Sequence, residues 1–315
     1  MTILTRFSAK DFRELLQLYS IGSYRSHKHI PYALGNTNYA LRTTEGEFIV
    51  KVFENSNMRC AAFMLKIEEY LHKRGIRVPR VVLSGNGKDL LTLKGKPVAL
   101  YAFIKGRHTK RLTEGLTMGL ARNIGLMHRE LRKLRFKGRG DWMPANRIVS
   151  HMRSKHSNSF VEGEYSGLRR ELKSIRYSRL KKSIIHGDLG YINFIVEKDR
   201  LKAFIDFDDV HRDFLVHDLA VLFAHTFMSY KRIKRDRIRL FMRHYQKIIR
   251  LNDEEKRAML TFIKVRLISV MIWHEMQKAK HTDQIRKIRE AISNTQQQYR
   301  MLSRISPERF AGMLE

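Results

Sequence analysis

Residues 186–208 constrain the fold of this chain more than any other stretch. They read His-Gly-Asp-Leu-Gly-Tyr-Ile-Asn over positions 186–193, and Ile-Asp-Phe-Asp follows at positions 205–208. Apolar runs before, between and after these polar residues predict a strand, a turn and a second strand. Such an arrangement places the amide of Asn193 and the carboxylate of Asp206 close enough to share one ion.

The order of the polar side chains fits phosphoryl transfer from a magnesium nucleotide. That reaction requires a carboxylate that accepts the proton of an attacking hydroxyl, and ligands for the metal ion that neutralises phosphate charge. Asp188 and Asn193 are therefore the predicted catalytic residues. Asn193 and Asp206 are the predicted metal ligands, because amide and carboxylate oxygens suit Mg²⁺. Single Asp or Asn residues are common at turns, but four polar residues in this order favour a kinase that uses ATP and Mg²⁺.

The two motifs resemble those of the aminoglycoside phosphotransferase and choline kinase superfamily, whose members are related to the protein kinases. The resemblance extends in order over most of residues 5–225, and the N-terminal half is most similar to homoserine kinase of the bacterial type. The stretches that carry the second similarity are residues 35–39, 46–54, 74–79 and 93–100.

The expected fold class is α+β, with two lobes like those of a protein kinase. The N-terminal lobe, residues 1–104, is expected to hold a five-stranded antiparallel sheet. The residue pattern predicts its strands at Thr37–Leu41, Phe48–Phe53, Val81–Leu83, Leu90–Leu93 and Val98–Phe103. The C-terminal lobe, residues 105–315, is expected to be mainly helical and to carry the catalytic loop and the acceptor site.

The nucleotide is expected to bind between the lobes. Lys51 lies in the strand that follows the turn at residues 35–38, and the resemblance implies that it contacts the α and β phosphates. The turn itself contributes Asn36, Thr37 and Asn38 to the predicted nucleotide site. A hinge formed by Ala102, Phe103 and Ile104 is expected to bind adenine through its backbone.

A glutamate on the predicted helix Cys60–Arg74 is expected to pair with Lys51. Glu68 is the favoured residue, because helical spacing places it on one face with Met64 and Leu71. Its neighbour Glu69 remains an alternative at this point, since either side chain can be solvated on a helix surface.

Further helices are predicted in the second lobe. In the second lobe, Asp218 is expected to have a structural role, either by holding the catalytic loop or by capping a helix. His128 is expected to pack within the lobe rather than to bind a metal ion. The single cysteine, Cys60, excludes an internal disulfide and a cysteine-built metal site. One further helix is expected in the N-terminal lobe, at Phe7–Tyr19. Those of the second lobe are expected at Thr113–Leu134, parts of Arg147–Tyr177, Asp218–Phe227, Ile238–Leu251, Asp253–Lys278 and Thr282–Leu302.

The charge exceeds what a kinase of small metabolites requires. The net charge is +31, with 16 Lys and Arg against 5 Asp and Glu in residues 129–182, and 13 against 4 in residues 231–266. Such density predicts contact with a polyanion such as tRNA, with stacking on interleaved Tyr165, Tyr177, Tyr230 and Tyr245. A uniformly basic proteome explains the charge equally well, since residues 1–104 hold 16 against 8.

Three functions remain open from the sequence. The first is an ATP-dependent kinase of a small polar metabolite such as homoserine, an amino alcohol or a sugar. The second is a kinase of the same fold that phosphorylates a hydroxyl of RNA, and the third is a non-catalytic nucleic-acid-binding pseudokinase. An acidic pocket formed by Asp208, Asp209 and Asp213 favours an amine-bearing acceptor. Without a long apolar run or signal pattern, the protein is expected to be soluble and cytoplasmic.

Overall fold

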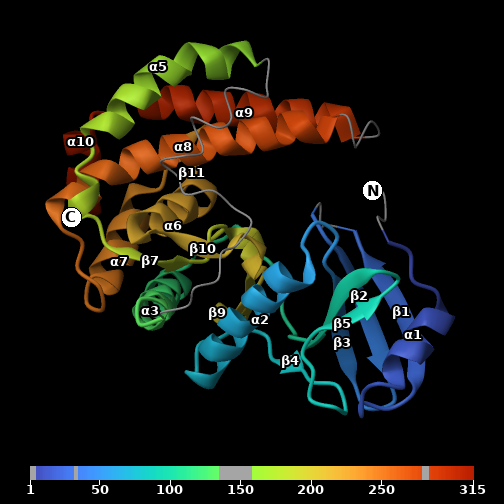
Figure 1. The fold of residues 1–315 in the computed structure, drawn as a ribbon. Helices are drawn as coiled ribbons and strands as arrows, with labels where there is room; N and C mark the ends of the chain where they lie inside the picture. Colours follow the sequence, from blue (N-terminus) through green and yellow to red (C-terminus); the bar gives the residue numbers. More distant parts are fainter. Residues whose placement is uncertain (1–4, 32–34, 135–157, 279–283) are drawn as a thin grey trace.

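The chain folds into two lobes of different composition. The computed structural model describes residues 5–31, 35–134, 158–278 and 284–315. Figure 1 shows a smaller lobe built on a sheet and a larger helical lobe, with helix α2 (Met58–Lys73) lying beside their junction. The α+β, kinase-like fold class predicted from the sequence is confirmed.

The N-terminal lobe is an antiparallel sheet whose strand order is β1-β2-β3-β6-β4, with β5 paired to β6. Strand β2 alternates buried and partly exposed side chains, which is the period expected of a sheet that is covered on one face. Helix α1 (Ala9–Leu16) begins with a capping box in which Ser8 and Asp11 bond each other's backbone N–H groups. The strands are β1 (Tyr24–Ile30), β2 (Thr37–Thr43), β3 (Glu47–Val52), β4 (Val81–Val82), β5 (Leu91–Leu93) and β6 (Lys96–Ala102).

The predicted number of strands was one too few. Five strands were expected, whereas the sheet in the described part of the N-terminal lobe has six, because Tyr24–Ile30 forms the edge strand β1. Its sequence, YRSHKHI, is mostly charged or polar, and none of its residues is fully buried. Charged side chains on an edge strand protect its unpaired backbone from other chains. Because the strand lacks alternating hydrophobic residues, the sequence pattern did not predict it.

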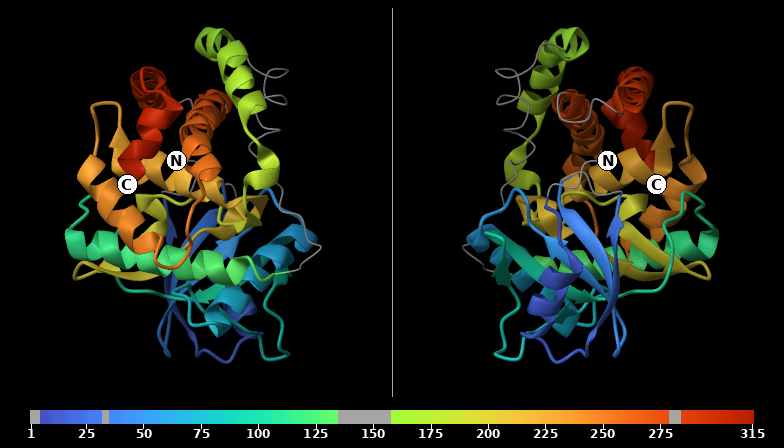
Figure 2. Two further views of the ribbon diagram at one scale, coloured as in Figure 1. Left: turned by 90° about the vertical axis from the view of Figure 1, so that its left-hand side faces the viewer. Right: turned by 90° about the vertical axis from the view of Figure 1, so that its right-hand side faces the viewer.

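The larger lobe packs its helices around an apolar core. Helix α8 (Asp253–Lys278) runs beside α9 (Ile285–Ser303) and against α6 (Leu215–Leu222). Figure 2 shows α5 (Ser159–Ser174) on the outer side of this pair. The remaining helices are α3 (Glu114–Leu131), α7 (Arg235–Tyr245) and α10 (Pro307–Ala311). Among the described residues, no helix is long and apolar enough to cross a membrane.

The predicted helices correspond to these elements, but some ends differ by several residues: the prediction Ile238–Leu251 is observed as α7, Arg235–Tyr245, and α6 begins at Leu215 rather than at Asp218. The prediction Asp253–Lys278 matches α8, and the prediction Asp218–Phe227 matches α6 together with the π-helical turn Phe223–Phe227. Part of the prediction over residues 147–177 is α5, while residues 147–157 lie outside the described part of the chain. Residue 282, the expected start of the last helix, lies outside it as well.

Short strand pairs place the polar motifs at the junction of the lobes. Strand β7 (Lys182–Ile185) leads into residues 186–193 and pairs with β10 (His211–Phe214). Strands β8 (Phe194–Glu197) and β9 (Arg200–Phe204) form the hairpin that separates Asn193 from Asp206. The predicted strand, turn, strand arrangement is therefore confirmed. A further pair, β11 (Met228–Ser229) and β12 (Arg232–Ile233), lies after α6.

Candidate active site

A buried carboxylate holds the backbone of the catalytic loop. Asp218, fully buried on α6, accepts hydrogen bonds from the backbone N–H of His186 at 2.8 Å and of Gly187 at 3.0 Å. Its Oδ2 also lies 3.1 Å from Nε2 of His128. Burial alone would raise the pKa of Asp218, but hydrogen bonding and the charge of His128 hold it below the usual value. Asp218 therefore ties the loop, and His128 is packed, as the sequence suggested.

The next residue of the loop has to be glycine. Gly187 has a φ of +84°, a left-handed conformation, and a Cβ at this position would lie 2.3 Å from the carbonyl oxygen of Asp209. The loop and the segment after Asp206 therefore approach each other more closely than any side chain permits. This contact aligns Asp188 with the acidic residues that follow β9.

Asp188 and Asn193 form one hydrogen-bonded unit. Nδ2 of Asn193 donates to the carboxylate Oδ2 of Asp188 at 2.9 Å and to its backbone carbonyl at 2.8 Å. Because Nδ2 is used in this way, Oδ1 is the atom of Asn193 that can ligate a metal ion. The carbonyl of Asn193 also accepts the N–H of Ile205 at 3.0 Å, which joins the loop to the residue before Asp206.

Two carboxylates meet the lysine of the other lobe. Nζ of Lys51 on β3 lies 3.1 Å from Oδ1 of Asp206 and also bonds Oδ1 of Asp208. Burial would lower the pKa of Lys51, but Asp208, Asp206 and Glu68 raise it far above its usual value. The two carboxyl groups shift in opposite directions. Burial and the charge of Asp206 raise the pKa of Asp208. Burial would also raise the pKa of Asp206, but the charge and hydrogen bond of Lys51 lower it below the usual value.

These oxygen donors fit a divalent ion of the magnesium type. Asn193, Asp206 and Asp208 offer only amide and carboxylate oxygens, which are the ligands that Mg²⁺ takes. The side chain of Asp206 is 46% exposed, so an ion bound to nucleotide phosphates can reach it. Asp208 was expected in an acidic pocket for an amine, but the structure turns it toward Lys51 and Nδ2 of Asn36.

Glu68 lies behind Lys51 rather than in an ion pair with it. Its carboxylate is buried and accepts a hydrogen bond from the hydroxyl of Tyr101 at 2.8 Å. Burial raises the pKa of Glu68 to about 7, against the lowering effect of Lys51. The alternative, Glu69, pairs at the helix surface with Lys73 at 2.7 Å. Of the two acids, Glu68 is the one that acts electrostatically on Lys51.

The side chains of the three predicted turn residues point in different directions. Asn38 stands directly opposite Lys51 in the β2–β3 register and so shares its face of the sheet. Thr37 points to the other face and bonds Glu54 at 2.7 Å, so its side chain faces away from Lys51. Asn36 bonds both Asp208 and the N–H of Glu54.

Two of the three hinge amides that were predicted to face adenine already donate hydrogen bonds to other backbone groups of the N-terminal lobe. The N–H of Ala102 donates to the carbonyl of Arg80 at 2.9 Å, and that of Phe103 donates to the carbonyl of Glu47 at 3.2 Å. Phe103 is 43% exposed. Binding of adenine by residues 102–104 therefore stays a prediction, which rests on the N–H of Ile104 and on the carbonyl groups of the segment.

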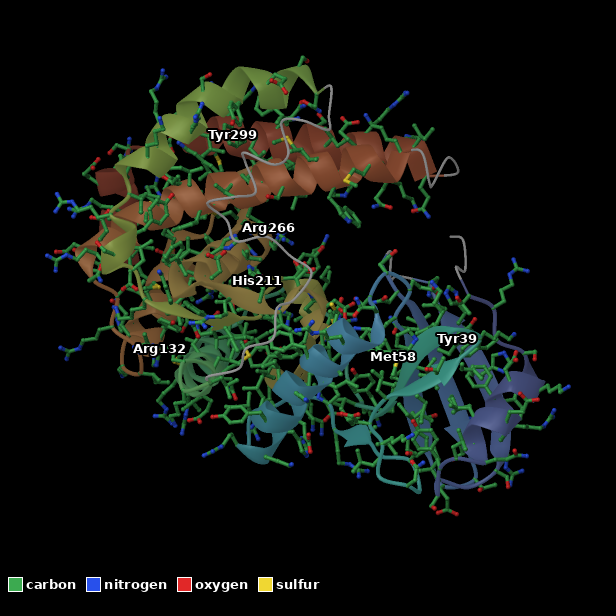
Figure 3. All side chains as sticks on the ribbon, viewed as in Figure 1. Tyr39, Met58, Arg132, His211, Arg266 and Tyr299 are labelled. Carbon is green, nitrogen blue, oxygen red and sulfur yellow. The ribbon has the colours of Figure 1, made fainter. Side chains whose placement is uncertain are left out.

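An arginine that the sequence analysis did not single out lies against Asp188, the predicted catalytic aspartate. Arg266 on α8, labelled in Figure 3, forms an ion pair with Oδ1 of Asp188, and its Nε donates a hydrogen bond to Nε2 of His225 at 2.8 Å. Burial raises the pKa of Asp188, and Arg266 opposes that effect. Burial and the Arg266 charge lower the pKa of His225 to about 3, so this imidazole is neutral and accepts the arginine N–H.

Asp209 completes the surroundings of Asp188. Burial and the charge of Asp188 raise the pKa of Asp209 to about 6, partly offset by Arg266. Asp213, the third member of the predicted acidic pocket, is 5% exposed and bonds Nδ1 of His217 at 2.8 Å. That part of the prediction was wrong, because Asp213 points into the core. Among the described residues, the junction of the lobes thus holds the carboxylate predicted as the base, oxygen ligands that suit a metal ion, and two cationic side chains, Lys51 and Arg266.

Such a site on a kinase-like fold defines a phosphotransferase, and comparison with known proteins identifies its family. Residues 29–250 match the model of the phosphotransferase enzyme family known as APH. The chain belongs to this family, whose members transfer phosphate to hydroxyl acceptors. The non-catalytic alternative is therefore set aside.

Relatives of this chain act on small molecules. It is 27% identical over 281 residues to a homoserine kinase of Brucella melitensis, covering 86% of this chain and 85% of that protein. An amicoumacin kinase solved with AMP-PNP and Ca²⁺ has a TM-score of 0.74 at 17% identity, covering 91% and 93% of the two chains. A microcompartment-associated aminopropanol kinase has a TM-score of 0.70 at 17% identity, covering 94% and 97%. Both structures show a shared fold.

The comparisons give no support to a nucleic-acid partner, and the structure weakens one part of that hypothesis. Tyr245 is fully buried and bonds His128 at 2.9 Å, so it cannot stack on a base. The hydroxyl of Tyr177 donates to the carbonyl of Leu172, and Lys181 pairs with buried Glu255. The predicted stacking by Tyr245 was wrong, and the comparisons assign no partner to the basic residues.

Proposed function

We propose that this protein is an ATP-dependent kinase of a small amino alcohol that also carries a carboxylate, with homoserine as the favoured acceptor. The observation that carries the proposal is the position of Asp188 between a cation, Arg266, and a second carboxylate, Asp209. The 27% identity to a homoserine kinase, over an alignment that covers 86% of this chain, supports the same acceptor class.

Asp188 is the proposed general base. It accepts the proton of the acceptor hydroxyl while the oxygen attacks the γ-phosphorus, and the bond from that phosphorus to the leaving ADP oxygen breaks. The hydrogen bond from Asn193 fixes the orientation of the Asp188 carboxylate, and its raised pKa makes it a stronger proton acceptor than an exposed aspartate. A bound Mg²⁺ would neutralise phosphate charge beside Asn193, Asp206 and Asp208.

The charges around Asp188 account for the preferred acceptor. In the structure Arg266 pairs with Asp188, so an incoming carboxylate competes for the guanidinium, which forms strong bidentate bonds with such groups. An ammonium group of the acceptor is in turn attracted by Asp209. A sugar satisfies neither charge, and an amino alcohol without a carboxylate satisfies only the second. The zwitterion is therefore the acceptor that this arrangement fits best.

The proposal is tested with an acceptor panel. Purified protein, ATP and Mg²⁺ are mixed separately with homoserine, 1-amino-2-propanol, a hexose or total tRNA, and phosphorylated product is detected by phosphorus NMR or radiolabel transfer. Homoserine is expected to give the highest kcat/KM. Phosphorylation of the hexose or tRNA alone would overturn the proposal.

A variant of Arg266 separates its role in acceptor binding from general damage. Charge-assisted hydrogen bonds contribute about 1.5–3 kcal/mol, so Arg266→Gln should lower kcat/KM for homoserine by roughly 10–150-fold. The loss for 1-amino-2-propanol should be much smaller, because that acceptor has no carboxylate to bind. Equal losses for both acceptors would contradict the assignment of Arg266. The matched control is Arg243→Gln, at an exposed arginine on α7.

A further inference from the structure

A buried cluster of two histidines and one aspartate lies outside the proposed catalytic machinery. His211 and Asp213 are on β10, and His217 lies in the first turns of α6, so a seven-residue segment supplies all three. Their exposed fractions are 2%, 5% and 2%. Figure 3 labels His211 in the interior of the larger lobe. The sequence prediction gave no role to either histidine.

The nitrogen and oxygen atoms of the three side chains converge on one point. Oδ2 of Asp213 lies 2.8 Å from Nδ1 of His217 and 3.5 Å from Nε2 of His211. One ligand atom from each residue lies within 4.8 Å of the others. Bonds of roughly 2.0–2.2 Å from one ion to nitrogen and oxygen ligands bring those atoms to similar separations.

Neighbouring groups orient two of these ligands for an ion. Nδ1 of His211 lies 2.6 Å from the carbonyl of Asp209, and because a carbonyl only accepts, Nδ1 carries the proton. In the neutral ring the lone pair is then on Nε2, facing Asp213. The other oxygen of Asp213, Oδ1, accepts the N–H of Phe214 at 2.7 Å. Contacts of this kind fix the tautomer and orientation of metal ligands in known sites.

Among the described residues, Nε2 of His211 and Nε2 of His217 are buried without a hydrogen-bond partner. Nε2 of His211 faces Asp213, whereas the atom of the His217 ring that contacts Asp213 is Nδ1, so His211 is the residue whose surroundings point to an ion. An unsatisfied buried polar atom costs free energy, so such atoms in a native core call for an explanation. A neutral His211 with its lone pair directed at a carboxylate is also electrostatically unfavourable. Either a proton on His211 or a metal ion between the side chains removes that repulsion.

We propose that His211, Asp213 and His217 bind a divalent transition-metal ion, with Zn²⁺ the ion that they suit best. Two imidazoles and one carboxylate form a donor set typical of zinc and of related ions, whereas Mg²⁺ takes oxygen ligands. Phe262 of α8 covers His217, with ring centroids 5.6 Å apart. Because all three side chains are buried, the ion would have a structural role and would join β10 to α6.

The site adjoins the catalytic loop without being part of it. Asp209, whose carbonyl orients His211, is the residue against which Gly187 packs. A metal ion on His211 would therefore stabilise the segment that holds Asp209 and the loop in register. Loss of the ion is expected to destabilise this part of the lobe before it affects nucleotide binding at Lys51.

The test measures zinc directly in the full-length protein. Protein freed of metal by a chelator is titrated with Zn²⁺ in competition with a chromophoric chelator, in the presence of millimolar Mg²⁺ to mask the nucleotide site. We expect one tight equivalent per chain and a raised Tm. An Asp206→Ala variant should keep that equivalent, which separates the new site from the proposed magnesium ligands.

Two substitutions of the ligands decide the outcome. His217→Gln and Asp213→Asn should lose the tight equivalent and its rise in Tm, while the control His72→Gln, at an exposed histidine of α2, should keep both. Circular dichroism and ATP binding show whether each variant is folded; if one unfolds, wild-type stoichiometry and the remaining variant decide. Absence of a tight equivalent in the wild type, or its survival in a folded ligand variant, overturns the proposal and leaves a protonated His211 as the explanation.

Discussion

The carboxylate of Asp218 offers a sharp test of how the catalytic loop is held. Asp218→Asn preserves the shape of the side chain but replaces one acceptor oxygen with an NH₂ group. The two backbone N–H groups bond different oxygens, at 2.8 and 3.0 Å. Whichever way the amide is oriented, at least one buried N–H then faces another donor.

The expected loss of stability in Asp218→Asn follows from the one backbone N–H that loses its acceptor. One lost hydrogen bond to a charged group removes about 1.5–3 kcal/mol, and the unsatisfied donor adds about 1–3 kcal/mol. We therefore expect the free energy of unfolding to fall by roughly 2.5–6 kcal/mol. At about 2 °C per kcal/mol, the lower value that applies to larger domains, the Tm should fall by roughly 5–12 °C.

Thermal unfolding followed by circular dichroism, without nucleotide, measures this change. The matched control is Asp236→Asn, an exposed aspartate in the first turn of α7, which should shift the Tm by about 1 °C or less. The kcat of Asp218→Asn should also fall by roughly 10²-fold, because a displaced loop misaligns Asp188. Equal Tm values for the two variants would refute the idea that Asp218 fixes the loop.

Four further outcomes are expected. Asp188→Asn should lower kcat by roughly 10²–10⁴ and leave the Kd of a fluorescent nucleotide nearly unchanged; an unchanged kcat would remove Asp188 as the base. Asp206→Ala should weaken ATP binding in Mg²⁺ but change it little in EDTA, as calorimetry can show. Because the pKa of Asp209 is about 6, its charge forms as pH rises from 5 to 7. KM for an amine-bearing acceptor should fall over that range, and in Asp209→Asn the pH dependence should be flat. Gly187→Ala should lower both kcat and Tm, since its Cβ would lie 2.3 Å from the Asp209 carbonyl; wild-type values would show that the loop can move aside.

Residues close in sequence to the two motifs were the most predictable part of the site. Asp188 and Asn193 are five positions apart on one loop, and a short hairpin separates them from Asp206. Their proximity depends on local turns, which the apolar runs on either side already specify. Asp218 was predictable for a similar reason, because α6, which carries it, follows the motif closely in sequence, although the helix begins at Leu215 rather than at Asp218.

The acceptor side of the site could not be read from the sequence. Arg266 reaches Asp188 from a helix 78 positions away in the chain, and in the sequence it is one of many arginines in a basic segment. Its neighbours on α8, Val265 and Leu267, are buried. A charged residue within such an apolar stretch was the available signal. Which partner it meets depends on how α8 packs on α6, and tertiary packing leaves no periodic trace in the sequence.

Asp208 and Asp213 show a second limit. Both were expected to face one acidic pocket, because they lie five residues apart after the same strand. The 3₁₀ turn Phe207–Asp209 and strand β10 send them in different directions, Asp208 to Lys51 and Asp213 to the histidines of the core. Side-chain direction across a short turn depends on backbone angles that composition does not fix.

The pairing of Arg266 with Asp188 also bears on wasteful hydrolysis of ATP. A kinase that holds ATP beside a free carboxylate base can activate water instead of its acceptor, and each such event consumes a nucleotide without product. While Arg266 occupies Oδ1 of Asp188, that carboxylate attracts a water proton less strongly. In the proposed function, an acceptor whose own carboxylate engages the arginine would restore the full basicity of Asp188 at the moment when a hydroxyl is in place. The ion pair would then couple consumption of ATP to the presence of that acceptor.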